Sequence, residues 1–422
     1  MSIANLLNKQ IGRVALTAAS TVCVLSLAIN TASAGPREQA KYIHDRIASS
    51  AADNATLTSM ANDISGGNVD AAIDTAMQNP NFLNVTVKNM VVPMTNKEST
   101  VFFPFNDAAA TMAGYIRDGL DYRGILSDDV IYTLNAGGLP GYSTTNNNHY
   151  AQAEHQNVNL RTALQQQTQS TVTGYPPEST SGVLTTRASA RAFFYAGTNR
   201  AMFRFAMLNY LCVDLEEIKD VTRVNDRVRQ DVSRSPGGDS DIFLNNCVGC
   251  HAGMDGLAGG YAYHQWGPPE FDPDDTNPDD ESMTYVVTPR IYQIDGVDIA
   301  AATRVTQKHF INRNNFIYGY ATVDDGWINY WRTGVNAKLG WANNTPQAPT
   351  TGSGAASLGT ELANTEAFAR CQVLKVYRHV CHNDPAESTL QTITNAFSGS
   401  TYDMRTVYRE SVKDCMSSNT NL

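Results

Sequence analysis

Apolar residues recur three and four positions apart along most of the chain, which is the spacing of amphipathic helices. In the first hundred residues this pattern predicts short helices at 41–51, 55–64, 70–77 and 81–90. Glycine and proline interrupt the pattern between them, and both residue types end helices. The chain should therefore begin with several short, packed helices.

The same spacing continues in the second half of the chain. Residues 187–219 carry apolar side chains on one face, which predicts one long helix. Its arginines lie off that face, where each either meets solvent or binds an acidic ligand group. They are Arg187, Arg191, Arg200 and Arg204. Further helices are predicted at 367–381, 385–397 and 402–414.

Three stretches depart from the helical pattern. Residues 136–182 are rich in Gly, Asn, Gln, Ser, Thr and Pro, which indicates either a surface insertion or a domain boundary. Residues 284–297 are β-branched and aromatic enough for one short hairpin. Residues 350–359 have the composition of a Gly/Ser/Ala linker. The prediction is a mainly α protein of multi-helix domains with at most a short β-hairpin.

The N-terminus has the pattern of a secretory signal peptide. Lys9 and Arg13 precede an apolar run at 14–29, and Ala32-Ser33-Ala34 has the small residues of a cleavage site. Because no later stretch offers roughly 18 consecutive apolar residues, no membrane span is expected in the mature chain. We therefore expect cleavage after Ala34 and a periplasmic or secreted protein.

The chain is acidic, and losing Lys9 and Arg13 lowers its formal net charge from −10 to −12. An acidic surface argues against nucleic acid and anionic lipid as partners, and it suits a basic redox partner protein. Taken with the composition changes, the chain divides into five regions. They are the signal peptide 1–34, a helical region 35–135, a polar connection 136–185, a central region 186–345 and C-terminal helices 346–422.

The central region contains Cys247-Val248-Gly249-Cys250-His251, the C-x-x-C-H pattern of c-type haem attachment. On a helix, residues three and four apart share a face, so both thiols and the imidazole can meet one flat ligand. The thiols would bond the porphyrin and His251 would be the proximal iron ligand. A zinc site would need a second close Cys or His pair. A thioredoxin-like redox site would lie in a βαβ pattern, which this neighbourhood does not show. Two ordinary disulfide cysteines beside a surface histidine are the alternative that stays open.

Around this motif the sequence resembles a known group. Cys247 to Leu257 is similar to the C-x-x-C-H-a-x-M-D-x-L segment of uncharacterised exported bacterial cytochrome-c-like proteins, found in proteobacteria and related to planctomycete haem-domain proteins. Residues 200–212, 325–331 and 368–373 also resemble that group. The resemblance implies one covalent haem c in a mostly helical exported protein, but the group has no agreed activity.

The second axial ligand is not fixed by the motif. Met254 lies three residues after His251, on the proximal side, so it cannot easily cross the ring. Met283 is our first choice for the distal ligand, with His309 and His264 as alternatives and an open site also allowed. His149 and His155 are six apart, a poor spacing for shared ligation, and are expected at the surface.

The remaining cysteines are expected in disulfides. One of seven leaves with the signal peptide and two belong to the motif, which leaves an even number in an oxidising compartment. Cys371 and Cys381 lie about 15 Å apart on one predicted helix, too far to bond to each other. The following helix pair returns Cys415 to Cys381, which leaves Cys212 for Cys371.

Two further patterns have open interpretations. Glycine-rich residues 252–261 would let the backbone pass close to a planar ligand. Trp327, Trp331 and Trp341 either line a haem crevice or only pack. The acidic stretch 272–281 lacks the spacing of a calcium loop, so a solvated loop is expected, with calcium binding as the second possibility.

These patterns together predict a monohaem c-type cytochrome that transfers electrons outside the cytoplasm. No catalytic residue is assigned, because an electron carrier is favoured over a substrate-converting enzyme. One alternative is a haem-dependent, peroxidase-like oxidoreductase with an open distal site, which would need a nearby acid or base. A further one is a surface or assembly protein in which the haem is structural.

Overall fold

In the computed structural model, the N-terminal helices occur close to where the apolar spacing predicts them, although the first begins at Pro36 instead of 41 and ends at Ala48 instead of 51. They are α1 Pro36–Ala48, α2 Asn54–Ser65, α3 Val69–Gln78, η1 Phe82–Val87, α4 Lys88–Val91 and η2 Val92–Thr95. Asp53 caps α2 by accepting a hydrogen bond from the Thr56 backbone N–H, and Asn68 caps α3 in the same way at Ala71. Ile43, Ile47 and Ile73 are fully buried, so the amphipathic faces form a core as expected.

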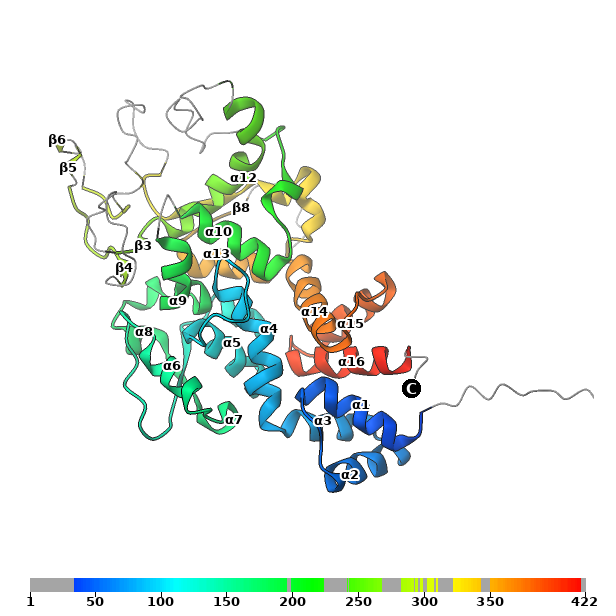
Figure 1. Ribbon diagram of the computed structural model, residues 1–422. Coiled ribbons are helices and arrows are strands. Elements are labelled where there is room, and N and C mark those ends of the chain that lie inside the picture. The colour runs from blue at the N-terminus through cyan, green and yellow to red at the C-terminus, as the bar shows by residue number, and fades with distance from the viewer. Residues whose placement is uncertain are drawn as a thin grey trace, which may run out of the picture. The chain divides into compact units, whose positions relative to one another are not determined.

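The structure describes part of the chain: 34–195, 199–223, 241, 243–267, 282–291, 293–294, 297–298, 302–306, 309, 322–342 and 350–418. The predicted apolar run of the signal peptide and the acidic stretch 272–281 lie outside these residues. Ala34–Leu422 make up one compact unit (Figure 1). One cluster of buried side chains runs from Ala40 to Cys415, so the regions separated by composition share a core.

Helix α5, Asp107–Asp118, is buried along nearly its whole length. The side chain of Asn106 caps its start, and Gly119, with φ of 63°, ends it in the left-handed conformation that glycine tolerates. It packs on the sheet formed by β1, Val130–Leu134, and β2, Leu164–Thr168. Around this sheet lie η3 Tyr122–Leu126, α6 Asn148–His155, α7 Leu160–Ala163, α8 Gln169–Thr173, η4 Pro177–Ser179 and η5 Gly182–Thr185.

Part of the polar stretch 136–182 therefore packs into the fold as helices and a strand. The expectation of a surface position for His149 is wrong. Its ring is 5% exposed, accepts the backbone N–H of Leu134 at 2.9 Å and donates to the Pro140 carbonyl at 2.7 Å. The edge of β1 thus supplies the polar partner that a buried imidazole needs. His155, at the end of α6, is exposed as predicted.

The long helix predicted at 187–219 is broken into pieces. These are α9 Arg187–Ser189, η6 Ala190–Phe194, α10 Arg200–Ala206, η7 Met207–Leu211 and η8 Leu215–Ile218. Asn199 is left-handed, with φ of 58°, and its amide donates to the Tyr261 and His264 carbonyls at 2.6 and 2.7 Å. Cys212, with φ of 56°, ends η7. Bonds to distant segments thus override the local helical pattern.

The central and C-terminal elements contain the remaining strands. They are η11 Phe243–Cys247, α12 Val248–Ala258, η12 Gly259–Tyr261, β3 His264–Trp266, β4 Met283–Tyr285, β5 Gln293–Ile294, β6 Val297–Asp298, β7 Gly326–Asn329, η16 Tyr330–Arg332, η17 Gly334–Leu339, β8 Thr350–Ser353, α13 Gly354–Ala363, α14 Glu366–Cys381, α15 Glu387–Gly399 and α16 Met404–Ser417. The described strands form four two-stranded antiparallel sheets. The prediction of a mainly α fold is confirmed, and all its described strands are short.

Two local predictions need correction. Residues 284–297 do not form a single hairpin. Strand β4 pairs with β3, which lies outside this stretch, and β5 pairs with β6 in a short hairpin at its end. The stretch 350–359 is not a linker but strand β8 and the start of the buried helix α13. Its small residues allow close packing: a Cβ on Gly359 would lie 1.7 Å from the Leu126 carbonyl oxygen.

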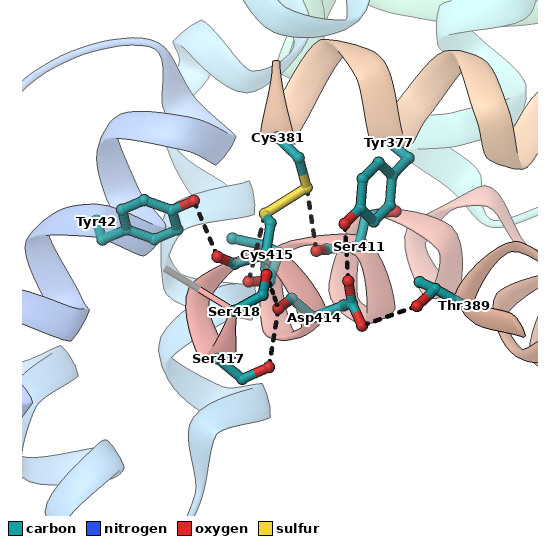
Figure 2. The surroundings of a disulfide bond; sticks show 10 residues. Tyr42, Tyr377, Cys381, Thr389, Ser411, Asp414, Cys415, Ser417 and Ser418 are labelled. Atoms are coloured by element: carbon teal, nitrogen blue, oxygen red, sulfur yellow. Dashed lines mark hydrogen bonds between the residues drawn. A yellow bond between two sulfur atoms is a disulfide. The ribbon is translucent and has the colours of Figure 1, made fainter. Parts of the chain in front are cut away.

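Both predicted disulfides are present, Cys212–Cys371 and Cys381–Cys415. The second joins α14 to α16, and beside it Asp414 accepts a hydrogen bond from Tyr377 at 2.7 Å (Figure 2). Helix α16 also contacts α1, where Tyr42 donates to the Cys415 carbonyl at 3.4 Å. The last helix therefore closes the core against the first.

Candidate haem-attachment site

The C-x-x-C-H motif spans the junction of two helical segments. Cys247 is the last residue of η11, while Cys250 and His251 lie in the first turn of α12. All three are partly exposed, with the His251 side chain at 23%. Because successive helical residues are about 100° apart, Cys247, Cys250 and His251 fall on one side of the helix axis. We call this side the motif face.

The opposite side of α12 consists of glycines. A Cβ on Gly253 would lie 2.0 Å from the Trp331 indole, and one on Gly256 would lie 2.9 Å from the Ile328 carbonyl oxygen. The prediction that these glycines admit a planar ligand is therefore corrected, because β7 and Trp331 already fill this glycine face. The glycines set the position of α12 and leave the motif face for chemistry.

The three tryptophans pack instead of lining a crevice. Trp327, Trp331 and Trp341 are at most 4% exposed and belong to the hydrophobic core. Trp327 donates to the Ser357 hydroxyl at 2.8 Å and Trp341 to the Asn336 carbonyl at 3.1 Å. Their function is to hold β7 and the following turns against the glycine face.

His251 is held by a carboxylate four residues further along α12. Its Nδ1 lies 3.1 and 3.2 Å from the two carboxylate oxygens of Asp255. A carboxylate can only accept, so Nδ1 carries the proton and the neutral ring has its lone pair on Nε2. This is the tautomer with which a histidine binds a metal through Nε2.

Asp255 is in turn bound by Arg200 from α10. Arg200 donates through Nε to one carboxylate oxygen and through Nη2 to the other, the latter at 2.9 Å. The Asp255 side chain is only 3% exposed, and its burial opposes the charged form. Arg200 and the hydrogen bond from His251 outweigh burial, so the pKa of Asp255 lies below its usual value. The result is an Arg200–Asp255–His251 relay of ionic and hydrogen bonds with a buried carboxylate at its centre.

The two motif thiols are not in disulfides, unlike Cys212, Cys371, Cys381 and Cys415. The sulfur of Cys250 lies 3.4 Å from the Leu215 carbonyl oxygen of η8. Burial, followed by the carboxylate of Glu216, raises the pKa of the Cys250 thiol. At neutral pH this side chain is therefore a thiol rather than a thiolate.

The predicted distal ligands lie in other elements. Met283 in β4 is 2% exposed and pairs in register with Trp266 of β3. His264, on the same small sheet, is 1% exposed and donates through Nε2 to the Ser179 carbonyl at 2.8 Å. This sheet follows the C-terminal end of α12, whereas His251 lies in its first turn. His309 is buried as well. Ligation by any of the three stays a prediction.

Two residues of the site were not assigned from the sequence. Asp255 had a usable signal, because four residues separate it from His251, the spacing at which helical side chains meet. Arg200 was expected to meet solvent or an acidic ligand group, and it binds Asp255 instead. Arg204, one turn later, pairs with Asp214 and is more exposed. Only the fold shows which arginine lies behind the motif.

Known proteins give no further guidance on this site. Within the described residues no group of three or more His, Cys, Asp or Glu is placed to hold a metal ion. No helix in the same part of the chain is long and apolar enough to cross a membrane. The resemblance of 247–257 to exported cytochrome-c-like proteins stays a prediction, because no protein-family model, no curated protein and no solved structure matches this chain.

Proposed function

We propose that this chain is a monohaem c-type cytochrome that transfers electrons outside the cytoplasm. One observation carries the proposal. Cys247 and Cys250 remain thiols on the same helix face as His251, while the other four cysteines that follow Ala34 are joined in pairs. Two thiols and an imidazole at this spacing are the set of groups that attaches haem c.

The surroundings of the motif fit this use. Asp255 fixes the His251 tautomer that presents its lone pair at Nε2, and Arg200 keeps Asp255 charged. Trp331 and the glycine face hold α12 in place from behind. Haem, when bound, would supply one-electron chemistry between ferrous and ferric iron. The chain's own part is to attach it, orient His251 and set its electrostatic surroundings.

The proposed location outside the cytoplasm has separate support. Two disulfides suit an oxidising compartment, where such bonds persist. The sequence pattern of residues 1–34 is that of a cleaved export signal. A net charge of −10 favours docking to a basic redox partner protein through complementary charge.

A haem-dependent oxidoreductase is a second candidate, and one observation favours it. The partner of His251 is a carboxylate rather than a backbone carbonyl, and a negative partner makes the imidazole a stronger electron donor to iron. Electron-rich axial ligands assist oxygen activation. Carbon monoxide binding to the ferrous protein distinguishes the two candidates. A six-coordinate carrier resists it, whereas an open distal site binds it readily.

The test of the main proposal is expression of the full chain in a bacterial periplasm together with a haem-attachment system. We expect the purified protein to be heavier than its polypeptide by one haem, with the thioether-type spectrum of a c-type cytochrome in the reduced state. Cys247→Ala/Cys250→Ala should lose the covalent haem, and His155→Ala, which changes an exposed histidine, should retain it. A wild-type product of bare polypeptide mass would refute the proposal.

A further inference from the structure

The Arg200–Asp255 pair behind His251 differs from the pair that the second arginine of α10, Arg204, forms with Asp214. Arg200 and Arg204 lie one turn apart on α10, and each binds a carboxylate through two nitrogens. Asp214, the partner of Arg204, has a side chain 24% exposed, whereas that of Asp255 is 3% exposed. Of these two carboxylates, Asp255 is the one that reaches the motif histidine.

We infer that Asp255 is a positioning residue that lowers the reduction potential of the haem, by holding His251 as an electron-rich ligand. This inference rests on the proposed function. A carboxylate that accepts the hydrogen bond from Nδ1 increases the basicity of Nε2. A more basic ligand stabilises ferric iron over ferrous iron, because the ferric ion carries the larger positive charge. Arg200 acts through Asp255 by holding the carboxylate in place with two hydrogen bonds.

Burial strengthens this effect. A hydrogen bond to a carboxylate weakens when water competes for the acceptor, and little water reaches Asp255, whose side chain is 3% exposed. The bond also joins residues four apart in one helix, so it needs no rearrangement of the fold to form. The carboxylate is therefore arranged before the iron arrives, which favours attachment through Nε2 over Nδ1.

The experiment is potentiometric titration of haem-loaded wild type, Asp255→Asn, Asp255→Glu and Asp214→Asn. Asn has the shape of Asp without its charge, so D255N should favour the ferrous form about tenfold more at a given ambient potential. For a one-electron couple that is a rise of about 59 mV. D255E keeps the charge and should remain closer to wild type. D214N is the matched control. It also removes a carboxylate near the motif, but this carboxylate binds Arg204. It should shift the potential by less than half as much.

A second measurement needs no variant. In the ferrous wild-type protein, the Nδ1 proton of His251 should exchange slowly with deuterated solvent and should resonate far downfield. Rapid exchange overturns the inference, and so does a fully loaded D255N with an unchanged potential. Neither result affects the proposed function, which fails only if the wild-type chain carries no covalent haem.

Discussion

The two disulfides close loops of very different length, which makes their contributions to stability separable. Cys212–Cys371 joins residues 159 apart in sequence, and Cys381–Cys415 joins residues 34 apart. In the chain-entropy model, a crosslink stabilises by restricting the unfolded chain, and the effect grows with the logarithm of loop length. Opening the longer loop should cost about 5.1 kcal/mol and opening the shorter about 3.8 kcal/mol. The difference is about 1.4 kcal/mol, a tenfold change in the folding equilibrium.

The matched variants are Cys212→Ala/Cys371→Ala and Cys381→Ala/Cys415→Ala. Cys371, Cys381 and Cys415 are at most 8% exposed and Cys212 is partly exposed, so in both pairs alanine removes at least one buried sulfur. Much of that cost cancels when the two variants are compared. Cys212 is already a non-glycine residue at positive φ, so alanine adds no new backbone strain there.

The assay is urea unfolding followed by tryptophan fluorescence, which reports on the buried Trp327, Trp331 and Trp341. We expect the larger loss in the variant without Cys212–Cys371. An equal or larger loss in the variant without Cys381–Cys415 would contradict the entropy argument. In that case the hydrogen bonds around Asp414 and Tyr377, shown in Figure 2, would contribute more to the free energy of unfolding than loop length does.

Two further predictions concern the packing of α12 and the titration of His379. Gly253→Ala should destabilise the protein by about 1–3 kcal/mol in urea unfolding, because its Cβ would overlap Trp331, although alanine normally favours a helix. Gly137→Ala, with no atom within 4 Å of its Cβ, is the control, and a stabilised G253A would refute the packing described here. Burial lowers the pKa of His379 below 6.5, so its contribution is fully present above that value and is lost as pH falls below it. Between pH 7 and 5, His379→Gln should therefore lose less free energy of unfolding than wild type or the exposed control His155→Gln. Equal losses in all three proteins would disprove a lowered pKa at His379.

The helices of the first hundred residues were predictable because their pattern is local. In α1 to α3 the apolar residues recur at the helical period, and Asp53 and Asn68 stand at the cap positions. The disulfide partners were predictable for a related reason. Helix length alone prevents Cys371 from reaching Cys381, and the return of the next two helices brings Cys415 back to Cys381.

The wrong predictions share a different cause, which is contact between segments far apart in sequence. The break at Asn199 depends on carbonyls of Tyr261 and His264. The burial of His149 depends on a backbone N–H in β1. The stretch 350–359 resembles a linker because its residues are small, yet their smallness serves the close approach of α13 to Leu126. Composition cannot distinguish a flexible small residue from a tightly packed one.

Helix α12 shows how this ambiguity bears on the candidate site. Its sequence contains two groups of unusual residues, the Cys and His of the motif and the glycines within and after the motif. The pattern alone assigns both groups to a ligand. Helical geometry separates them, because 247, 250 and 251 lie opposite 249, 253 and 256. Trp331 and β7 cover this glycine face at Gly253 and Gly256, and Lys219 and Val221 cover it at Gly249, so the glycines serve packing. The motif face, supported from within α12 by Asp255, is the side from which the proposed haem would have to approach.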